Sequence, residues 1–153
     1  PPPPPTRRYI EMFGYKCTLQ TDTEVITYII DYLVRKRGLT LRETSHVIAA
    51  SFWSTIADKD EESREQETLL RRMFPSLLVT GPFSIILGYT GGLMALGDRL
   101  KLRSMVCAEK GDVAYMASEE CAIREICPQP EIVYSPAGGE PVIYELYDKE
   151  AGR

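Results

Sequence analysis

Apolar residues in the first half of the chain recur at spacings of three and four, which is typical of amphipathic helices. Thr21 and Glu24 stand in the spacing of a capping box, and Gly38 follows the apolar run as a helix stop. The pattern therefore predicts a helix over residues 22–37. Its apolar stripe consists of Val25, Ile26, Ile29, Ile30 and Leu33.

Two further helical segments follow the first. Thr40 and Glu43 repeat the capping-box spacing, and an apolar face then continues through about residue 57, formed by Leu41, Val47, Ile48 and Ile56. Residues 58–67 form a dense charge run, which is either a loop or a solvated helix. After the charge run, apolar residues again have the spacing of a buried helix face, and Pro75 ends this helix. The apolar residues are Leu69, Leu70, Met73 and Phe74.

In two other regions apolar and polar residues alternate with a period of two, which indicates strands. A helical turn followed by a strand is predicted over residues 7–20. The pattern beyond Pro75 predicts β-hairpins. The predicted strands there are 83–89, 93–96, 104–109, 113–117, 131–134 and 141–146, with a short helix over 118–124 capped by Ser118. Helices first and antiparallel hairpins afterwards predict an α+β layered fold.

Length and charge narrow the class of protein. The 153 residues suit one domain, and the net charge of −4 argues against a nucleic-acid partner. The basic runs 35–37 and 71–72 are expected on solvated helix ends. No apolar run approaches the roughly 20 residues that span a bilayer, so no membrane partner is expected. Residues 1–5 are all proline and suggest a linker or cut end, with the main domain over 6–148 and a tail over 149–153.

The cysteines and the single histidine offer little chemistry. Cys17, Cys107, Cys121 and Cys127 lack CxxC spacing, and we interpret them as reduced thiols of a cytoplasmic protein. Together with His46 they supply too few ligands for a metal site, so neither a metal nor a cofactor is expected. No sequence feature nominates a partner for His46, which favours a surface or packed histidine over a general base.

Asp22 is the candidate site residue. It falls in the first turn of the predicted helix over 22–37, beside the positive end of the helix dipole. A carboxylate in this position is ionised and well placed to receive a cationic group. The alternative is that Asp22 only strengthens the start of the helix, as acidic residues in first turns commonly do.

Five segments in order resemble the second half of a class II glutamine amidotransferase domain of the glutamate synthase kind. They are residues 21–25, 81–84, 92–99, 102–103 and 115–119, and the resemblance covers residues 7–147. It implies a four-layer α/β/β/α sandwich of the N-terminal nucleophile hydrolase type, which hydrolyses glutamine and passes ammonia to a flavin-containing synthase partner. By the same resemblance Asp22 receives the α-amino group of glutamine, Arg99 and Arg103 are structural, and Ser118 and Glu119 form a strand-to-helix cap.

The chain also departs from that family. The family uses an N-terminal cysteine as nucleophile and an Asn-Gly pair as oxyanion donor, whereas this chain starts with Pro1 and contains no asparagine. No catalytic residue is therefore assigned here. The resemblance instead makes an N-terminal half, carrying the nucleophile, a partner of this chain. Two alternatives remain open: a non-catalytic docking or regulatory subunit with the same fold, and an unrelated α+β protein.

Overall fold

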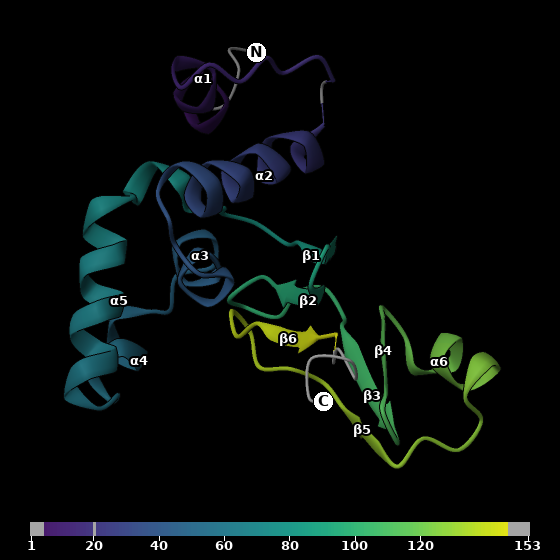
Figure 1. Ribbon diagram of the computed structural model, residues 1–153. Helices are drawn as coiled ribbons and strands as arrows, with labels where there is room; N and C mark the ends of the chain where they lie inside the picture. The colour runs from purple at the N-terminus through teal and green to yellow at the C-terminus, as the bar shows by residue number, and fades with distance from the viewer. Residues whose placement is uncertain (1–4, 20, 147–153) are drawn as a thin grey trace, which may run out of the picture. The chain divides into compact units, whose positions relative to one another are not determined.

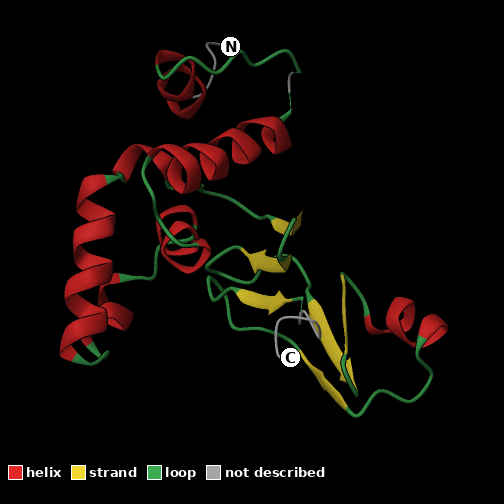
Figure 2. Ribbon diagram, viewed as in Figure 1, coloured by secondary structure: helices red, strands yellow, loops and turns green. Residues whose placement is uncertain are grey.

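The computed structural model describes residues 5–19 and 21–146, which form two compact units divided between Val79 and Thr80 (Figure 1). The first unit is helical, and the second contains the strands together with one helix (Figure 2). The predicted α+β class with antiparallel sheets is confirmed. No helix among the described residues is long and apolar enough to cross a membrane.

The first unit contains five α-helices, a π-helical turn and a 3₁₀ turn among its described residues. Their bounds are α1 Pro5–Met12, α2 Asp22–Asp31, η1 Tyr32–Lys36, α3 Leu41–Ile48, α4 Trp53–Ala57, α5 Glu61–Met73 and η2 Pro75–Leu77. Their apolar faces meet in a core that includes Ile10, Ile29, Leu33, Val47, Ile48, Ile56, Leu70 and Leu77.

The helix predicted over residues 22–37 is present, but it is not regular throughout. It begins as α2 with Thr21 as its N-cap and passes directly into the π-helical turn η1. Gly38 ends it with φ +72°, a conformation that glycine adopts without strain. The capping box is only half formed: Thr21 Oγ1 accepts the Glu24 N–H at 3.3 Å, while the Glu24 carboxylate bonds other residues.

The second predicted helix is divided in two. The capping box of Thr40 and Glu43 is complete, and α3 ends at Ile48 rather than continuing to residue 57. The carbonyl of Ile48, which has no partner in the next helical turn, accepts the Val79 N–H at 2.9 Å. The Arg71 guanidinium donates to the carbonyl of Ser51. Partners from distant segments thus satisfy the backbone where the chain leaves the helix.

The charge run and the residues after it form one helix, α5. Asp60 caps it by accepting the Ser63 N–H at 2.9 Å, and it ends before Pro75 as predicted. Its buried stripe runs through Glu67 and Leu70. Leu69 and Met73 are each 58% exposed, so their assignment to the core was wrong. Leu69 lies one residue, or about 100°, from Leu70 and therefore faces away from the buried stripe, whereas Met73 is the last residue of α5.

The strand predicted within residues 7–20 is wrong. Residues 5–12 form α1, and residues 15–19 are irregular, because side chains rather than a neighbouring strand supply their hydrogen-bond partners. Both basic runs do lie at helix ends, at the last turns of η1 and α5.

The second unit contains two three-stranded antiparallel sheets. The strands are β1 Ser84–Tyr89, β2 Gly92–Gly97, β3 Val106–Lys110, β4 Val113–Ala117, β5 Ile132–Tyr134 and β6 Val142–Glu145. One sheet has the order β1-β2-β6 and the other the order β4-β3-β5. Both predicted hairpins are confirmed, with β1 paired to β2 and β3 paired to β4.

The two sheets share one core and one polar connection. Ala95 from the first sheet and Cys107 from the second belong to the same buried cluster. Tyr144 on β6 donates its hydroxyl to Glu109 on β3 at 2.7 Å and lies 3.0 Å from the Tyr134 hydroxyl. Burial raises the pKa of Tyr144, so this hydroxyl remains a donor. The two antiparallel sheets of the second unit are therefore joined by a common buried cluster and by this hydrogen bond.

Helix α6, Glu120–Ile126, lies against β4 and β3. Its N-cap position is Glu119, in an extended conformation, and no side chain caps it. The predicted cap by Ser118 is wrong, because Ser118 lies one residue too early for its hydroxyl to reach the first turn.

The buried carboxylate of Asp98 organises the loop that joins β2 to β3. Its side chain accepts four backbone N–H groups at 3.0–3.3 Å, from Phe83, Leu100, Leu102 and Arg103. Burial alone would raise the pKa of Asp98, yet these N–H donors hold it below the usual value. One ionised group therefore holds both ends of the first hairpin.

Replacing Asp98 with Asn should lower the free energy of unfolding of the second unit by about 2–3 kcal/mol at pH 7, because buried N–H groups lose a charged acceptor. The folded-state pKa of Asp98 lies below its unfolded value. Its contribution is thus complete above about pH 4 and is lost as pH falls through the lowered pKa. Urea unfolding at pH 7 and pH 3 measures both effects. The exposed Glu125→Gln on α6 is the control.

Candidate functional site

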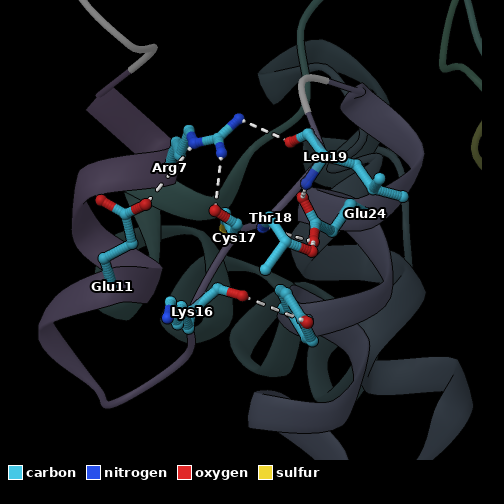
Figure 3. A network of polar contacts seen from close by, with 8 residues as sticks. Arg7, Glu11, Lys16, Cys17, Thr18, Leu19 and Glu24 are labelled. Atoms are coloured by element: carbon cyan, nitrogen blue, oxygen red, sulfur yellow. Dashed lines mark hydrogen bonds and ion pairs between the residues drawn. The ribbon is translucent and has the colours of Figure 1, made fainter.

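The segment of residues 15–19, which leads into α2, is held by the carboxylate of Glu24 (Figure 3). One oxygen accepts the Thr18 N–H at 2.8 Å and the Thr18 hydroxyl at 3.1 Å, and the other accepts the Leu19 N–H at 2.8 Å. Desolvation works against ionisation of Glu24, but these donors keep its pKa below the usual value. The loop is thereby tied to the first turn of the helix that carries Asp22.

Arg7 holds the same segment from the side of α1. Its guanidinium donates to the carbonyl of Leu19 at 2.9 Å and to that of Cys17 at 3.0 Å, and it forms an ion pair with Glu11 at 3.5 Å (Figure 3). Glu24 satisfies the N–H groups of the loop and Arg7 satisfies its carbonyls. The two side chains together fix an irregular backbone without a strand partner.

Tyrosines tie the beginning of the loop to α2. Tyr15 donates to Asp31 at 2.6 Å, and Tyr28 donates to the Lys16 carbonyl at 3.4 Å. Burial and the Asp31 carboxylate raise the pKa of Tyr15 to about 12, so its hydroxyl stays protonated and remains a donor. The loop is therefore attached to α2 at both of its ends.

Asp22 is the first residue of α2, and its side chain is exposed. Among the described residues, none forms a hydrogen bond or ion pair with the Asp22 carboxylate. The N-cap Thr21 has an extended conformation, so Asp22 stands at the positive end of the helix dipole. Chemically, this arrangement offers an unpaired carboxylate at a fixed helix start, which can receive an ammonium group.

Two of the free thiols, Cys17 and Cys107, have raised pKa values. Cys17 lies in the loop, but burial raises its pKa, and the thiol form therefore dominates at neutral pH. Cys107 is fully buried, and its pKa is raised to about 11. Neither of these two thiols is therefore activated as a nucleophile.

His46 is packed rather than exposed, which agrees with one of the two structural roles expected for it. Its Nδ1 lies 2.8 Å from a carboxylate oxygen of Glu67, which also contacts the Lys59 ammonium. The sequence-based interpretation missed this partner, because Glu67 was assigned to a solvated charge run. Its spacing of three and seven residues from Leu70 and Phe74 was the signal for a buried position. Nothing brings this cluster into contact with Asp22 within the described part of the chain.

The backbones of Arg99 and Arg103, which the resemblance gives as structural residues, make close contacts. The Arg103 N–H bonds Asp98, and the Arg99 carbonyl lies so near Gly138 that a Cβ there would stand 2.6 Å from its oxygen. The described residues include no group of three or more side chains that could hold a metal ion.

Comparison with known proteins identified two relatives. The chain is 44% identical over 144 residues to an "Uncharacterized protein" of Archaeoglobus fulgidus, covering 94% of this chain and 38% of that protein. It is 36% identical over 92 residues to a protein of Methanothermobacter thermautotrophicus named "Putative glutamine amidotransferase", covering 60% of this chain and 29% of that protein. The chain thus spans well under half the length of either relative. No family model and no solved structure matches the chain.

Replacing Glu24 with Gln should release the loop, because an amide is a weaker acceptor than a carboxylate and orients one oxygen only. The Thr18 and Leu19 amides should then exchange hydrogen faster. In the unaltered protein the same protection should be present above about pH 4.3 and disappear as pH falls through the lowered Glu24 pKa. Hydrogen exchange followed by NMR measures both effects.

The matched control is Glu43→Gln, which removes the corresponding capping carboxylate from α3. It should speed exchange at Thr40 and leave Thr18 and Leu19 unchanged. Equal protection of Thr18 and Leu19 in Glu24→Gln and the unaltered chain would show that Glu24 does not hold the loop.

Proposed function

We propose that this chain is part of a class II glutamine amidotransferase of the glutamate synthase kind, in which it contributes the carboxylate that binds glutamine. Glutamine would place its α-ammonium group against Asp22 at the start of α2. The observation that carries the proposal is the exposed Asp22 carboxylate, which has no partner among the described residues and stands at a helix start that its neighbours hold in place.

The ordered loop before α2 and the charge of Asp22 both support this assignment. The preceding loop is tied by Glu24 and Arg7, so binding costs little additional ordering of the backbone. A charge-assisted hydrogen bond between an ammonium and a carboxylate is also stronger than one between neutral groups. The relative named as a glutamine amidotransferase adds independent support, although it matches only 60% of the chain.

In the proposed reaction, polypeptide outside this chain supplies the nucleophile, and this chain binds the substrate. A cysteine thiolate outside this chain attacks the side-chain amide carbon of glutamine, the C–N bond breaks, and protonated nitrogen leaves as ammonia. Water then hydrolyses the resulting thioester to glutamate and restores the thiol. This chain would hold and orient the substrate during both steps, and the raised pKa values of Cys17 and Cys107 keep these two thiols protonated.

The proposed domain would have an α/β/β/α arrangement. The two sheets of the second unit share one core, as the two central layers of such a sandwich would. The partners in this proposal are the N-terminal half of the domain and a flavin-containing synthase that consumes the ammonia. The reaction would take place in the cytoplasm.

Replacing Asp22 with Asn in the complete enzyme should raise the KM for glutamine about 10- to 100-fold, since a hydrogen bond to a charged group contributes about 1.5–3 kcal/mol. Stability should change by no more than about 1 kcal/mol, through the lost helix-dipole interaction. Ammonia release from glutamine measures the first effect and thermal unfolding the second. Glu61→Gln is the matched control, because Glu61 is also an exposed acid in a first helical turn.

A glutamine analogue without the α-amino group sharpens this test. The unaltered enzyme should strongly prefer glutamine over the deaminated analogue, and Asp22→Asn should lose most of that preference. An unchanged KM, or an unchanged preference, would contradict the role of Asp22. Absence of any ammonia release from natively purified protein with its partners would instead favour the docking or regulatory subunit.

A further inference from the structure

A hollow of about 180 Å³ lies in the first unit, at the place where α3 ends. Its walls come from the end of α3, the start of α4, the end of α5 and the chain around η2. Two of the lining residues are Trp53 and Arg71. The others are apolar or proline: Val47, Ala50, Phe74, Pro75 and Leu78.

Hydrogen bonds between distant segments hold the walls of the hollow in place. The chain leaves the helix at Ala49, which has φ −117° and ψ 45°. Beside this residue the Ile48 carbonyl accepts the Val79 N–H at 2.9 Å, and the Ser51 carbonyl accepts the Arg71 guanidinium. The hollow is therefore formed before any ligand binds, as is typical of small-molecule sites.

Trp53 and Arg71 give one wall of the hollow its polar character. The guanidinium carbon of Arg71 lies 4.1 Å from the centre of the Trp53 ring, a cation–π contact, and Trp53 is 50% exposed. The ring and the Ser51 carbonyl together orient the guanidinium. None of the lining residues is acidic. The hollow thus combines apolar walls with one fixed positive charge.

Volume and lining together define the class of ligand. In another protein, an apolar cavity of about 150 Å³ lined by Leu, Ile and Phe binds benzene, so this hollow accommodates an apolar group of about five or six carbon atoms. A guanidinium matches the geometry of a carboxylate and forms charge-assisted hydrogen bonds with it. An apolar group that carries a carboxylate therefore complements both the apolar walls and the charge of Arg71.

We infer that the hollow is a binding site for a small carboxylic acid with a branched or cyclic apolar group. The apolar group fills the space between α3 and α5, and the carboxylate bonds the Arg71 guanidinium beside the Trp53 ring. None of the residues that line the hollow belongs to the loop before α2 or holds it. The site is thus distinct from the one proposed for glutamine.

The test uses isocaproate, a branched six-carbon acid, as the probe and Trp53 as the reporter, because Trp53 is the single tryptophan of the chain. Isocaproate should shield the Trp53 ring from water and shift its fluorescence emission to shorter wavelengths in a saturable manner. Isocaproamide has nearly the same shape but no charge, so it should bind about tenfold more weakly. Acetate keeps the charge without the apolar group and should cause no shift.

Arg71→Gln keeps an N–H donor for the Ser51 carbonyl and removes the positive charge. It should weaken isocaproate binding about tenfold and abolish the preference for the acid over the amide. The matched control is Arg72→Gln, because Arg72 is the next residue of α5, is exposed and does not line the hollow. It should change neither affinity. Circular dichroism establishes that both variants fold.

Ala50→Leu tests the cavity itself. Ala50 is 3% exposed and lines the hollow, so a larger side chain there should occupy the space and abolish the shift caused by either ligand. If Arg71→Gln does not fold, the comparison of acid with amide in the unaltered chain still decides the role of the charge.

Three outcomes would overturn the inference: no saturable shift up to about 50 mM isocaproate, a concentration at which even so small a ligand should bind, equal affinities for acid and amide, or a shift that survives Ala50→Leu. Equal affinities would identify a purely apolar hollow, of the kind that receives a side chain of another protein. Glutamine takes no part in these measurements, so they can fail while the role of Asp22 stands, and the reverse.

Discussion

Irregular backbone needs hydrogen-bond partners, and in the described part of the chain two carboxylates each bond several backbone N–H groups of one irregular segment. Glu24 holds the segment before α2, and Asp98 holds the loop between β2 and β3. Both have lowered pKa values because ordered N–H groups favour the charged form. The helix start in the first unit and the hairpin in the second each depend on one such acid.

Local signals in the sequence were sufficient for most elements. Turn and cap residues such as Gly38 and Thr40 located helix ends, and alternation located both hairpins. The segment of residues 15–19 was misread because alternating apolar residues also occur where side chains from elsewhere hold the backbone. The strand assigned there had no neighbour to pair with, and only the three-dimensional structure shows that Arg7 and Glu24 take that place.

The candidate site was predictable in part. The sequence placed Asp22 in a first helical turn, and the structure shows the same position with an exposed carboxylate. The hydrogen bonds that hold residues 15–19 were not predictable. Those of Arg7 with Cys17 and Leu19 join residues that are ten and twelve positions apart in the sequence. The pairing of His46 with Glu67 was also not predicted. Glu67 belongs to a charge run, and such a run is interpreted as solvated unless the helix face of each residue is known.

The π-helical turn Tyr32–Lys36 has a consequence for how this helix tolerates changes in length. Its wide backbone bonds include the Arg37 N–H to the Tyr32 carbonyl, five residues apart, and it buries Tyr32 and Leu33. A π turn accommodates one residue more than the regular helix would. Removing a residue there would leave an ordinary α-helix, and the residues after it would keep nearly the same rotation about the helix axis. The π turn thus absorbs the additional residue, so that the buried stripe before it and the capping box of α3 after it stay in phase.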